Sequence, residues 1–203
     1  MPLLSIESVY EDVSLGLWQI DESPEDFYQL YPHLQTLEES LDKRYRSDAR
    51  KRETLAVRAL LFEMTRNSEL FIEHQPDGKP LLSNHWQLSI SHTRGYAALM
   101  LSANKRVGVD IEYVSDRVER IARRFIRPDE QAPDLHHKLL NWCAKEAAYK
   151  FYSEDRLEYF DMRVRFLEEE LDSFVLDNLK RNETITVHGH ISPSFILAYC
   201  HEE

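Results

Sequence analysis

Gly108-Val109-Asp110-Ile111-Glu112 is the stretch of sequence that most constrains the fold. Apolar residues at positions 107, 109 and 111 alternate with Gly108, Asp110 and Glu112, and this period of two predicts a buried strand over residues 107–112. Asp110 and Glu112 then lie on one face, roughly 6–7 Å apart, and repel each other by about 2–3 kcal/mol at an effective dielectric constant near 20. A divalent cation between them would turn that repulsion into attraction. The alternative is a solvated strand face that pairs with nearby arginines.

About thirty residues further on, Trp142-Cys143-Ala144-Lys145-Glu146-Ala147-Ala148-Tyr149-Lys150 predicts a helix. Trp142, Glu146 and Lys150 share one face at i, i+4 and i+8. Because this helix is largely apolar, its carboxylate and ammonium need partners. The alternative, an ordinary exposed Glu146–Lys150 pair, fits this apolar neighbourhood less well. Three carboxylates plus a lysine suit a magnesium ion that holds a phosphate ester. Lys145 lies about 100° round the helix, where it either contacts phosphate or faces solvent.

These two stretches occur together with Gly78-Lys79-Pro80 and Ser89-Ile90-Ser91-His92-Thr93. In order and spacing the four motifs resemble those of the 4′-phosphopantetheinyl transferases, specifically the Sfp-type group, and the resemblance runs from about residue 78 to residue 150. It implies an α/β (α+β) fold of two similar βα subdomains related by a pseudo-twofold axis, with the active site at their junction. It also implies Mg²⁺-dependent transfer of the 4′-phosphopantetheine arm of coenzyme A to a serine hydroxyl of an apo acyl or peptidyl carrier protein, with release of adenosine 3′,5′-bisphosphate.

The resemblance assigns roles to individual residues. The metal ligands would be Asp110, Glu112 and Glu146. The catalytic residues would be Asp110, Glu146 and Lys150. Glu146 would act as the base, directly or through water, and Lys150 would neutralise the pyrophosphate. The residues implied for coenzyme A binding are Gly78, Lys79, Pro80, Ser91, His92, Arg50, Arg52 and Lys150. The register near Arg50 and Arg52 leaves open which of them contacts the 3′-phosphate. Cys143 stands where many relatives have serine.

We expect two halves, residues 1–102 and residues 103–203. The resemblance assigns the coenzyme A-binding loops to the first half, and the metal site and carrier-protein docking to the second. Long helices at 48–66 and 133–152 each precede a similar stretch, at 90–100 and 191–200, which indicates two βαβ-like halves of about 100 residues. A shorter helix is expected to begin at Pro24, with Ser23 as its N-cap. The predicted strands are 3–9, 13–20, 88–91, 96–101, 107–112, 160–166, 173–176, 184–191 and 195–200.

Composition describes an ordinary globular protein, with 203 residues of which 42% are hydrophobic and 30% charged. No apolar run approaches the 18 or so residues of a transmembrane helix, and the N-terminus has no signal-peptide pattern. Cys143 and Cys200 form no CxxC motif, so we expect two buried free thiols in a reducing cytoplasm. The net charge of −11 argues against non-specific nucleic-acid binding. We expect a cytoplasmic monomer with neither membrane nor nucleic acid as partner.

Positive charge is nevertheless concentrated in two segments, residues 43–58 and 117–127. In the second, arginines interleave with apolar residues, which is typical of an amphipathic surface helix. The alternative is a dock for an acidic carrier-protein helix, formed by Arg117, Arg120, Arg123 and Arg124. The i, i+4 spacing of Arg120 and Arg124 places them on one helical face.

Two other functions use the same residues. One is a coenzyme A-binding sensor or scaffold without transferase activity, and the other is a metal-dependent nucleotide hydrolase. The presence of Asp110, Glu112, Glu146 and Lys150 together favours an active transferase over the sensor. The sequence leaves open which carrier protein and pathway are served, and whether Mg²⁺ or Mn²⁺ is preferred.

Overall fold

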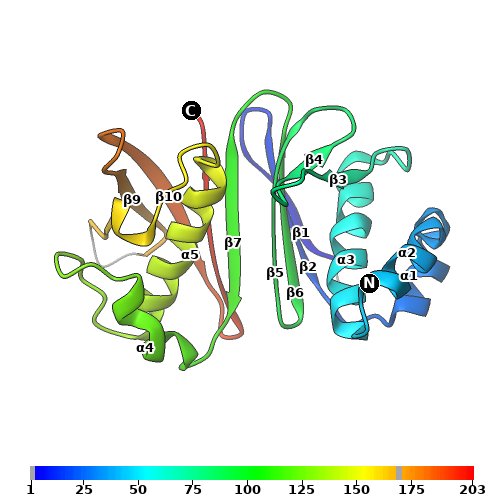
Figure 1. Cartoon of the computed structure of the whole chain (residues 1–203), viewed down its shortest axis with the longest axis horizontal. Coiled ribbons are helices and arrows are strands. Elements are labelled where there is room, and N and C mark those ends of the chain that lie inside the picture. The colour runs from blue at the N-terminus through cyan, green and yellow to red at the C-terminus, as the bar shows by residue number, and fades with distance from the viewer. Residues whose placement is uncertain (1–2, 168–170) are drawn as a thin grey trace. The chain divides into compact units, whose positions relative to one another are not determined.

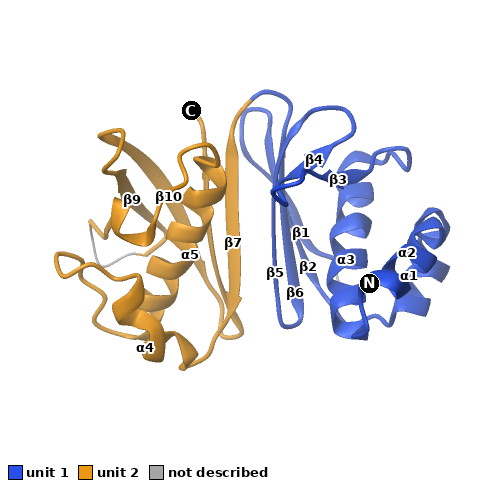
Figure 2. Ribbon diagram, viewed as in Figure 1, with its two compact units in different colours: residues 1–104 blue, residues 105–203 orange. Residues whose placement is uncertain are grey.

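The computed structural model describes residues 3–167 and 171–203 (Figure 1). The chain divides into two compact units, Met1–Asn104 and Lys105–Glu203 (Figure 2). Helices and strands occur in both units, so the mixed content predicted from the sequence is confirmed. No helix in the described residues is long and apolar enough to cross a membrane.

The N-terminal unit is built on a four-stranded sheet in the order β1-β2-β6-β5. Its strands are β1 (Leu3–Tyr10), β2 (Val13–Gln19), β5 (Gln87–Thr93) and β6 (Tyr96–Ser102). Helix α3 (Asp48–Thr65) packs on this sheet through Leu55 and Leu60, which are fully buried. The helix comes so close to β2 that a Cβ at Gly16 would lie 2.7 Å from Sδ of Met64. Glycine at this position therefore permits the helix to approach the sheet.

Smaller elements complete the N-terminal unit. Three short helices, α1 (Pro24–Leu30), η1 (Pro32–Leu37) and α2 (Glu38–Arg44), precede α3. The predicted N-cap is confirmed: the Ser23 side chain accepts from the Asp26 backbone, and the Asp26 carboxylate accepts from the Ser23 backbone. Strands β3 (Ile72–His74) and β4 (Pro80–Leu82) form a hairpin, in which Gly78 has a φ of 91°.

The C-terminal unit has a five-stranded sheet in the order β7-β11-β10-β9-β8. Its strands are β7 (Val107–Tyr113), β8 (Met162–Arg165), β9 (Ser173–Asn178), β10 (Glu183–Ile191) and β11 (Phe195–His201). Helix α5 (Leu135–Phe151) packs on β7 and β11. A Cβ at Gly108 would lie only 2.1 Å from the carbonyl oxygen of Ala147, so β7 passes directly beneath the helix.

The two units share a connectivity. In each, a strand leads to a long helix and then to a hairpin whose second strand pairs with that first strand: β2, α3, β5–β6 in one unit and β7, α5, β10–β11 in the other. The similar stretches at 90–100 and 191–200 span the turns of these two hairpins. The expected βαβ-like strand direction is wrong, because every pairing among the described strands is antiparallel. Both units are therefore α+β.

The arginine segment also differs from the prediction. Helix α4 (Arg117–Ile121) ends early and continues as the 3₁₀ turn η2 (Ala122–Arg124). Arg120 and Arg124 are therefore not an i, i+4 pair on one α-helix, because a 3₁₀ turn advances three residues per turn. The strand expected over 160–166 is shortened because the 3₁₀ turn η3 (Tyr159–Asp161) occupies its start.

Candidate active site

Strand β7 and helix α5 bring acidic side chains to one place in the C-terminal unit. Gly108 faces α5, and alternation along the strand puts Asp110 and Glu112 on the same side. The Cys143 thiol, fully buried on α5, lies near both carboxylates. Burial raises the pKa of that thiol well above its ordinary value, and the charges of Asp110 and Glu112 raise it further. The predicted free thiols, Cys143 and Cys200, are both buried, as expected.

Lys150 forms an ion pair with one of these carboxylates. Its ammonium lies 2.8 Å from Asp110 Oδ1 and also donates to the Val109 carbonyl at 2.8 Å. The Lys150 side chain is 27% exposed and the Asp110 side chain 8%. Strand and helix therefore present a carboxylate and an ammonium together, with the lysine still reaching solvent.

Glu146, one turn before Lys150, is bonded to a residue that the sequence did not indicate. The Tyr159 hydroxyl donates to Glu146 Oε1 at 2.7 Å. Burial raises the pKa of Glu146, and the Asp110 charge adds to this, while the Tyr159 hydrogen bond and the Lys150 charge act in the opposite direction. Asp110, Glu146, Lys150 and Tyr159 thus form one interacting group.

The donor set fits a hard divalent cation in its chemistry. Carboxylate oxygens are the ligands that Mg²⁺ takes in proteins, and the effect of Asp110 on the pKa of Glu146 is a like-charge repulsion that a cation would relieve. Within residues 3–167 and 171–203, however, no three His, Cys, Asp or Glu side chains are gathered closely enough to enclose a metal ion. Here Lys150 contacts Asp110, and Tyr159 contacts Glu146.

Two alternatives were predicted for Lys145, exposure to solvent and contact with phosphate. Both are wrong, because the structure buries its side chain away from solvent. Its side chain is completely buried, with the ammonium 2.8 Å from Glu130 and 2.6 Å from the Phe125 carbonyl. Burial lowers the pKa of Lys145 and the Glu130 charge opposes that effect. Glu130 also accepts from the backbone amides of Arg127 and Val164, at 2.6 and 2.7 Å. The pair therefore anchors the end of the arginine segment to α5 and β8.

Aromatic rings frame the same site. The Trp142 ring lies 5.0 Å from that of Phe125 and 5.3 Å from that of Tyr159, and the Phe125 and Tyr159 centroids are 6.3 Å apart. Trp142 is accordingly a packing residue. Tyr159 follows helix α5 in the 3₁₀ turn η3, where no periodic pattern in the sequence points to it.

A cavity of about 190 Å³ lies beside Trp142 and the end of β7. Glu112 and Trp142 line it together with Arg117 of α4. Arg117, Arg120, Arg123 and Arg124 are all exposed. One candidate metal ligand and one candidate docking arginine therefore border the same space.

In the N-terminal unit, two predicted coenzyme A residues meet at a carboxylate. Glu53 Oε2 lies 2.8 Å from Nη1 of Arg50 and 3.3 Å from Nδ1 of His92. His92 is exposed near the end of β5, whereas Ser91 is buried. The Nε of Arg52 is buried and has no hydrogen-bond partner in the part of the chain that the structure describes.

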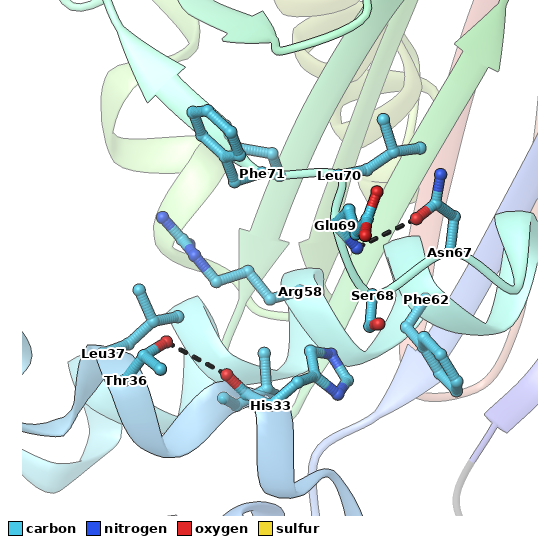
Figure 3. A pocket seen from close by; sticks show the side chains of 12 residues that line it. His33, Thr36, Leu37, Arg58, Phe62, Asn67, Ser68, Glu69, Leu70 and Phe71 are labelled. Carbon is cyan, nitrogen blue, oxygen red and sulfur yellow. Dashed lines mark hydrogen bonds between the residues drawn. The ribbon is translucent and has the colours of Figure 1, made fainter.

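Gly78, Lys79 and Pro80 occupy the β3–β4 hairpin, where the Lys79 backbone amide donates to Asp77 Oδ1 at 3.0 Å. A separate cavity of about 370 Å³ lies between η1, α3 and residues 67–72 (Figure 3). Arg58 lines it, and burial lowers the pKa of that guanidinium. None of the predicted coenzyme A residues is among the described residues that line this cavity.

The C-terminal unit matches the model of a known protein family. Residues 106–200 match the family model of the 4′-phosphopantetheinyl transferase superfamily. The match contains β7, α5 and the Asp110–Glu146–Lys150–Tyr159 group. The superfamily that matches the C-terminal unit is the one that the motifs resemble, and the Sfp-type subgroup stays a prediction. No curated protein sequence matched the chain.

Proposed function

We propose that the chain is a holo-[carrier-protein] synthase that transfers the 4′-phosphopantetheine arm of coenzyme A to a serine hydroxyl of an apo acyl or peptidyl carrier protein. The observation that carries the proposal is the grouping of Asp110, Glu146 and Lys150 on β7 and α5, inside the region that matches the superfamily. Two carboxylates and an ammonium at one point suit a reaction centre with a charged pyrophosphate and an attacking hydroxyl.

Asp110, Glu112 and Glu146 would hold Mg²⁺. When bound, the ion supplies charge neutralisation at the pyrophosphate and polarises the attacked phosphorus. Lys150 adds a second positive charge, which Asp110 orients through their 2.8 Å contact. Glu146 would accept the serine proton, directly or through water, because it lies beside Asp110 and Lys150 at the proposed reaction centre. The serine oxygen bonds to phosphorus as the bridging phosphorus–oxygen bond breaks, and adenosine 3′,5′-bisphosphate leaves.

Coenzyme A recognition is assigned to the N-terminal unit. We place its phosphates near Arg50, Arg52 and His92; one carboxylate, Glu53, pairs with Arg50 and His92. The contacts proposed for the rest of the nucleotide are Gly78, Lys79, Pro80 and Ser91. The buried Nε of Arg52 makes this arginine the preferred candidate for the 3′-phosphate, since a phosphate oxygen would supply the missing acceptor.

Carrier recognition is assigned to the arginine segment. Arg117, Arg120, Arg123 and Arg124 present positive charge in a chain of net charge −11, and local potential decides which partner approaches. Arg117 borders the same cavity as Glu112, so an acidic carrier helix held there would lie next to the proposed metal site. We further propose that the enzyme acts as a cytoplasmic monomer.

The test is incubation of the protein with coenzyme A and Mg²⁺, with and without a panel of apo acyl and peptidyl carriers. Carrier-dependent mass gain supports the transferase. Binding of coenzyme A without reaction would indicate the sensor or scaffold, and carrier-independent cleavage of coenzyme A would indicate the hydrolase.

A further inference from the structure

Tyr159 touches the proposed reaction centre from outside both family motifs. It lies in η3, thirteen residues after Glu146, and its hydroxyl is 2.7 Å from Glu146 Oε1. The ring is held by packing against Trp142 and Phe125, at centroid distances of 5.3 and 6.3 Å. Phe125 is itself fully buried, and its carbonyl accepts from Lys145. The phenol therefore approaches Glu146 from a fixed support.

We infer that Tyr159 is a positioning residue, which holds the Glu146 carboxylate in the orientation required for metal binding and for proton transfer. This inference rests on the proposed function. A glutamate side chain has several rotamers, and holding one of them costs free energy that a preformed hydrogen bond offsets before the substrate arrives. The hydroxyl uses one acceptor position of Glu146, and a carboxylate has roughly four, so positions remain for a cation or a water.

The hydroxyl and the ring of Tyr159 have separable roles. Phenylalanine would keep the contacts with Trp142 and Phe125, because those contacts are made by the ring. It would remove only the group that reaches Glu146. Tyr159→Phe therefore isolates the hydrogen bond without opening a cavity.

A matched control exists in the same unit. Tyr152 is buried, whereas Tyr159 is partly buried, and the Tyr152 hydroxyl has no hydrogen-bond partner among the residues that the structure describes. Tyr152→Phe makes the same chemical change without altering a carboxylate contact. Any effect common to both variants reflects packing or folding.

The experiment measures Mg²⁺ and Mn²⁺ binding to the free protein by calorimetry, together with kcat and KM for both substrates. For Tyr159→Phe we expect metal affinity to fall about threefold or more and kcat about tenfold, the factor for losing one hydrogen bond to a charged group. Both KM values and the melting temperature should stay near wild type, and Tyr152→Phe should change none of these quantities.

Wild-type metal affinity and kcat in Tyr159→Phe would overturn the inference, as would an equal loss in Tyr152→Phe. Failure of the proposed function gives a different result. If the wild type binds the metals but modifies no carrier, while Tyr159→Phe still weakens metal binding, the transferase assignment fails and the positioning role stands. If the wild type binds neither metal, the positioning role fails as well.

Discussion

The ammonium of Lys150 lies 2.8 Å from Asp110 Oδ1, which joins the one strand and the one helix that carry the acidic motifs. The contact means that the deeper of the two strand carboxylates already has a cationic partner in the folded protein. It also means that a substitution of Asp110 or Lys150 leaves the other residue without this ion-pair partner. A substitution of Glu146 breaks no ion pair within the described residues, so we expect its effect on stability to differ.

Glu146→Gln and Asp110→Asn should each lower turnover by roughly 10²-fold or more, because each removes a charge that acts at the reaction centre. Glu146→Gln should change the free energy of unfolding by less than about 1 kcal/mol, since it also removes repulsion from Asp110. Asp110→Asn should cost about 1–2 kcal/mol because Lys150 loses its carboxylate. Steady-state kinetics measure the turnover of both variants, and urea unfolding measures their free energy of unfolding. Normal turnover of either variant at saturating Mg²⁺ would refute the assignment of these carboxylates to the reaction centre.

His92→Ala should raise the KM for coenzyme A with little effect on the KM for the carrier. The structure adds a companion change, Glu53→Gln, which removes the carboxylate that Arg50 and His92 share and leaves two basic groups to meet phosphate. We expect it to keep or lower the KM for coenzyme A. Calorimetric titration with coenzyme A is the measurement, and unchanged affinity in His92→Ala would move the phosphates elsewhere.

Arg117→Glu combined with Arg120→Glu should raise the carrier KM about tenfold or more at low salt and flatten its salt dependence, because the charges steer an acidic partner. Both residues are exposed on α4 at i, i+3 spacing, which replaces the pairing of Arg120 with Arg124 that a continuous helix had suggested. The matched control is Arg66→Glu with Arg156→Glu, two exposed arginines outside the segment. Equal carrier KM values for the two double variants would leave the segment an ordinary surface.

Acid should destabilise the C-terminal sheet through Asp177. Hydrogen bonds from Arg165, Thr184 and Arg163 lower its pKa from 3.8 to about 2, with Arg165 the largest cause. A carboxyl with a lowered folded pKa binds fewer protons than in the unfolded chain, so its stabilisation is present above pH 4 or so and is lost as the pH falls toward 2. We expect the wild type to lose about 1–2 kcal/mol from this group over that window and Asp177→Asn to lack this loss. Urea unfolding from pH 6 to pH 2.5 measures it, and parallel profiles would contradict it.

Local pattern predicted most of the elements and the positions of the central carboxylates. The alternation in residues 107–112 was sufficient to predict a strand, and the apolar face of residues 48–66 was sufficient to predict a helix. Each pattern shows directly which side chains of that element are buried. The same patterns assigned Asp110 to the strand and Glu146 and Lys150 to the helix, and the structure brings these three side chains together.

Residues whose role depends on a distant partner were not predictable in this way. Lys145 is buried because Glu130, fifteen residues earlier, folds back on it, and nothing in the helix pattern distinguishes it from an exposed lysine. Tyr159 reaches Glu146 from a 3₁₀ turn, and Glu53 joins Arg50 to His92 across a helix and a strand. These contacts arise from tertiary packing, which sequence periodicity does not encode.

We propose that this chain moves phosphopantetheine from coenzyme A to a carrier serine with the β7–α5 carboxylates. Intact-protein mass spectrometry of an apo carrier, after incubation with coenzyme A, Mg²⁺ and either the wild type or Glu146→Gln, tests it most directly. We expect the wild type to add one phosphopantetheine to the carrier and the addition to disappear when the acceptor serine is replaced by alanine. We expect Glu146→Gln to be slower by roughly 10²-fold or more. An unmodified carrier across a panel of acyl and peptidyl carriers, or equal rates for the wild type and Glu146→Gln, would contradict it.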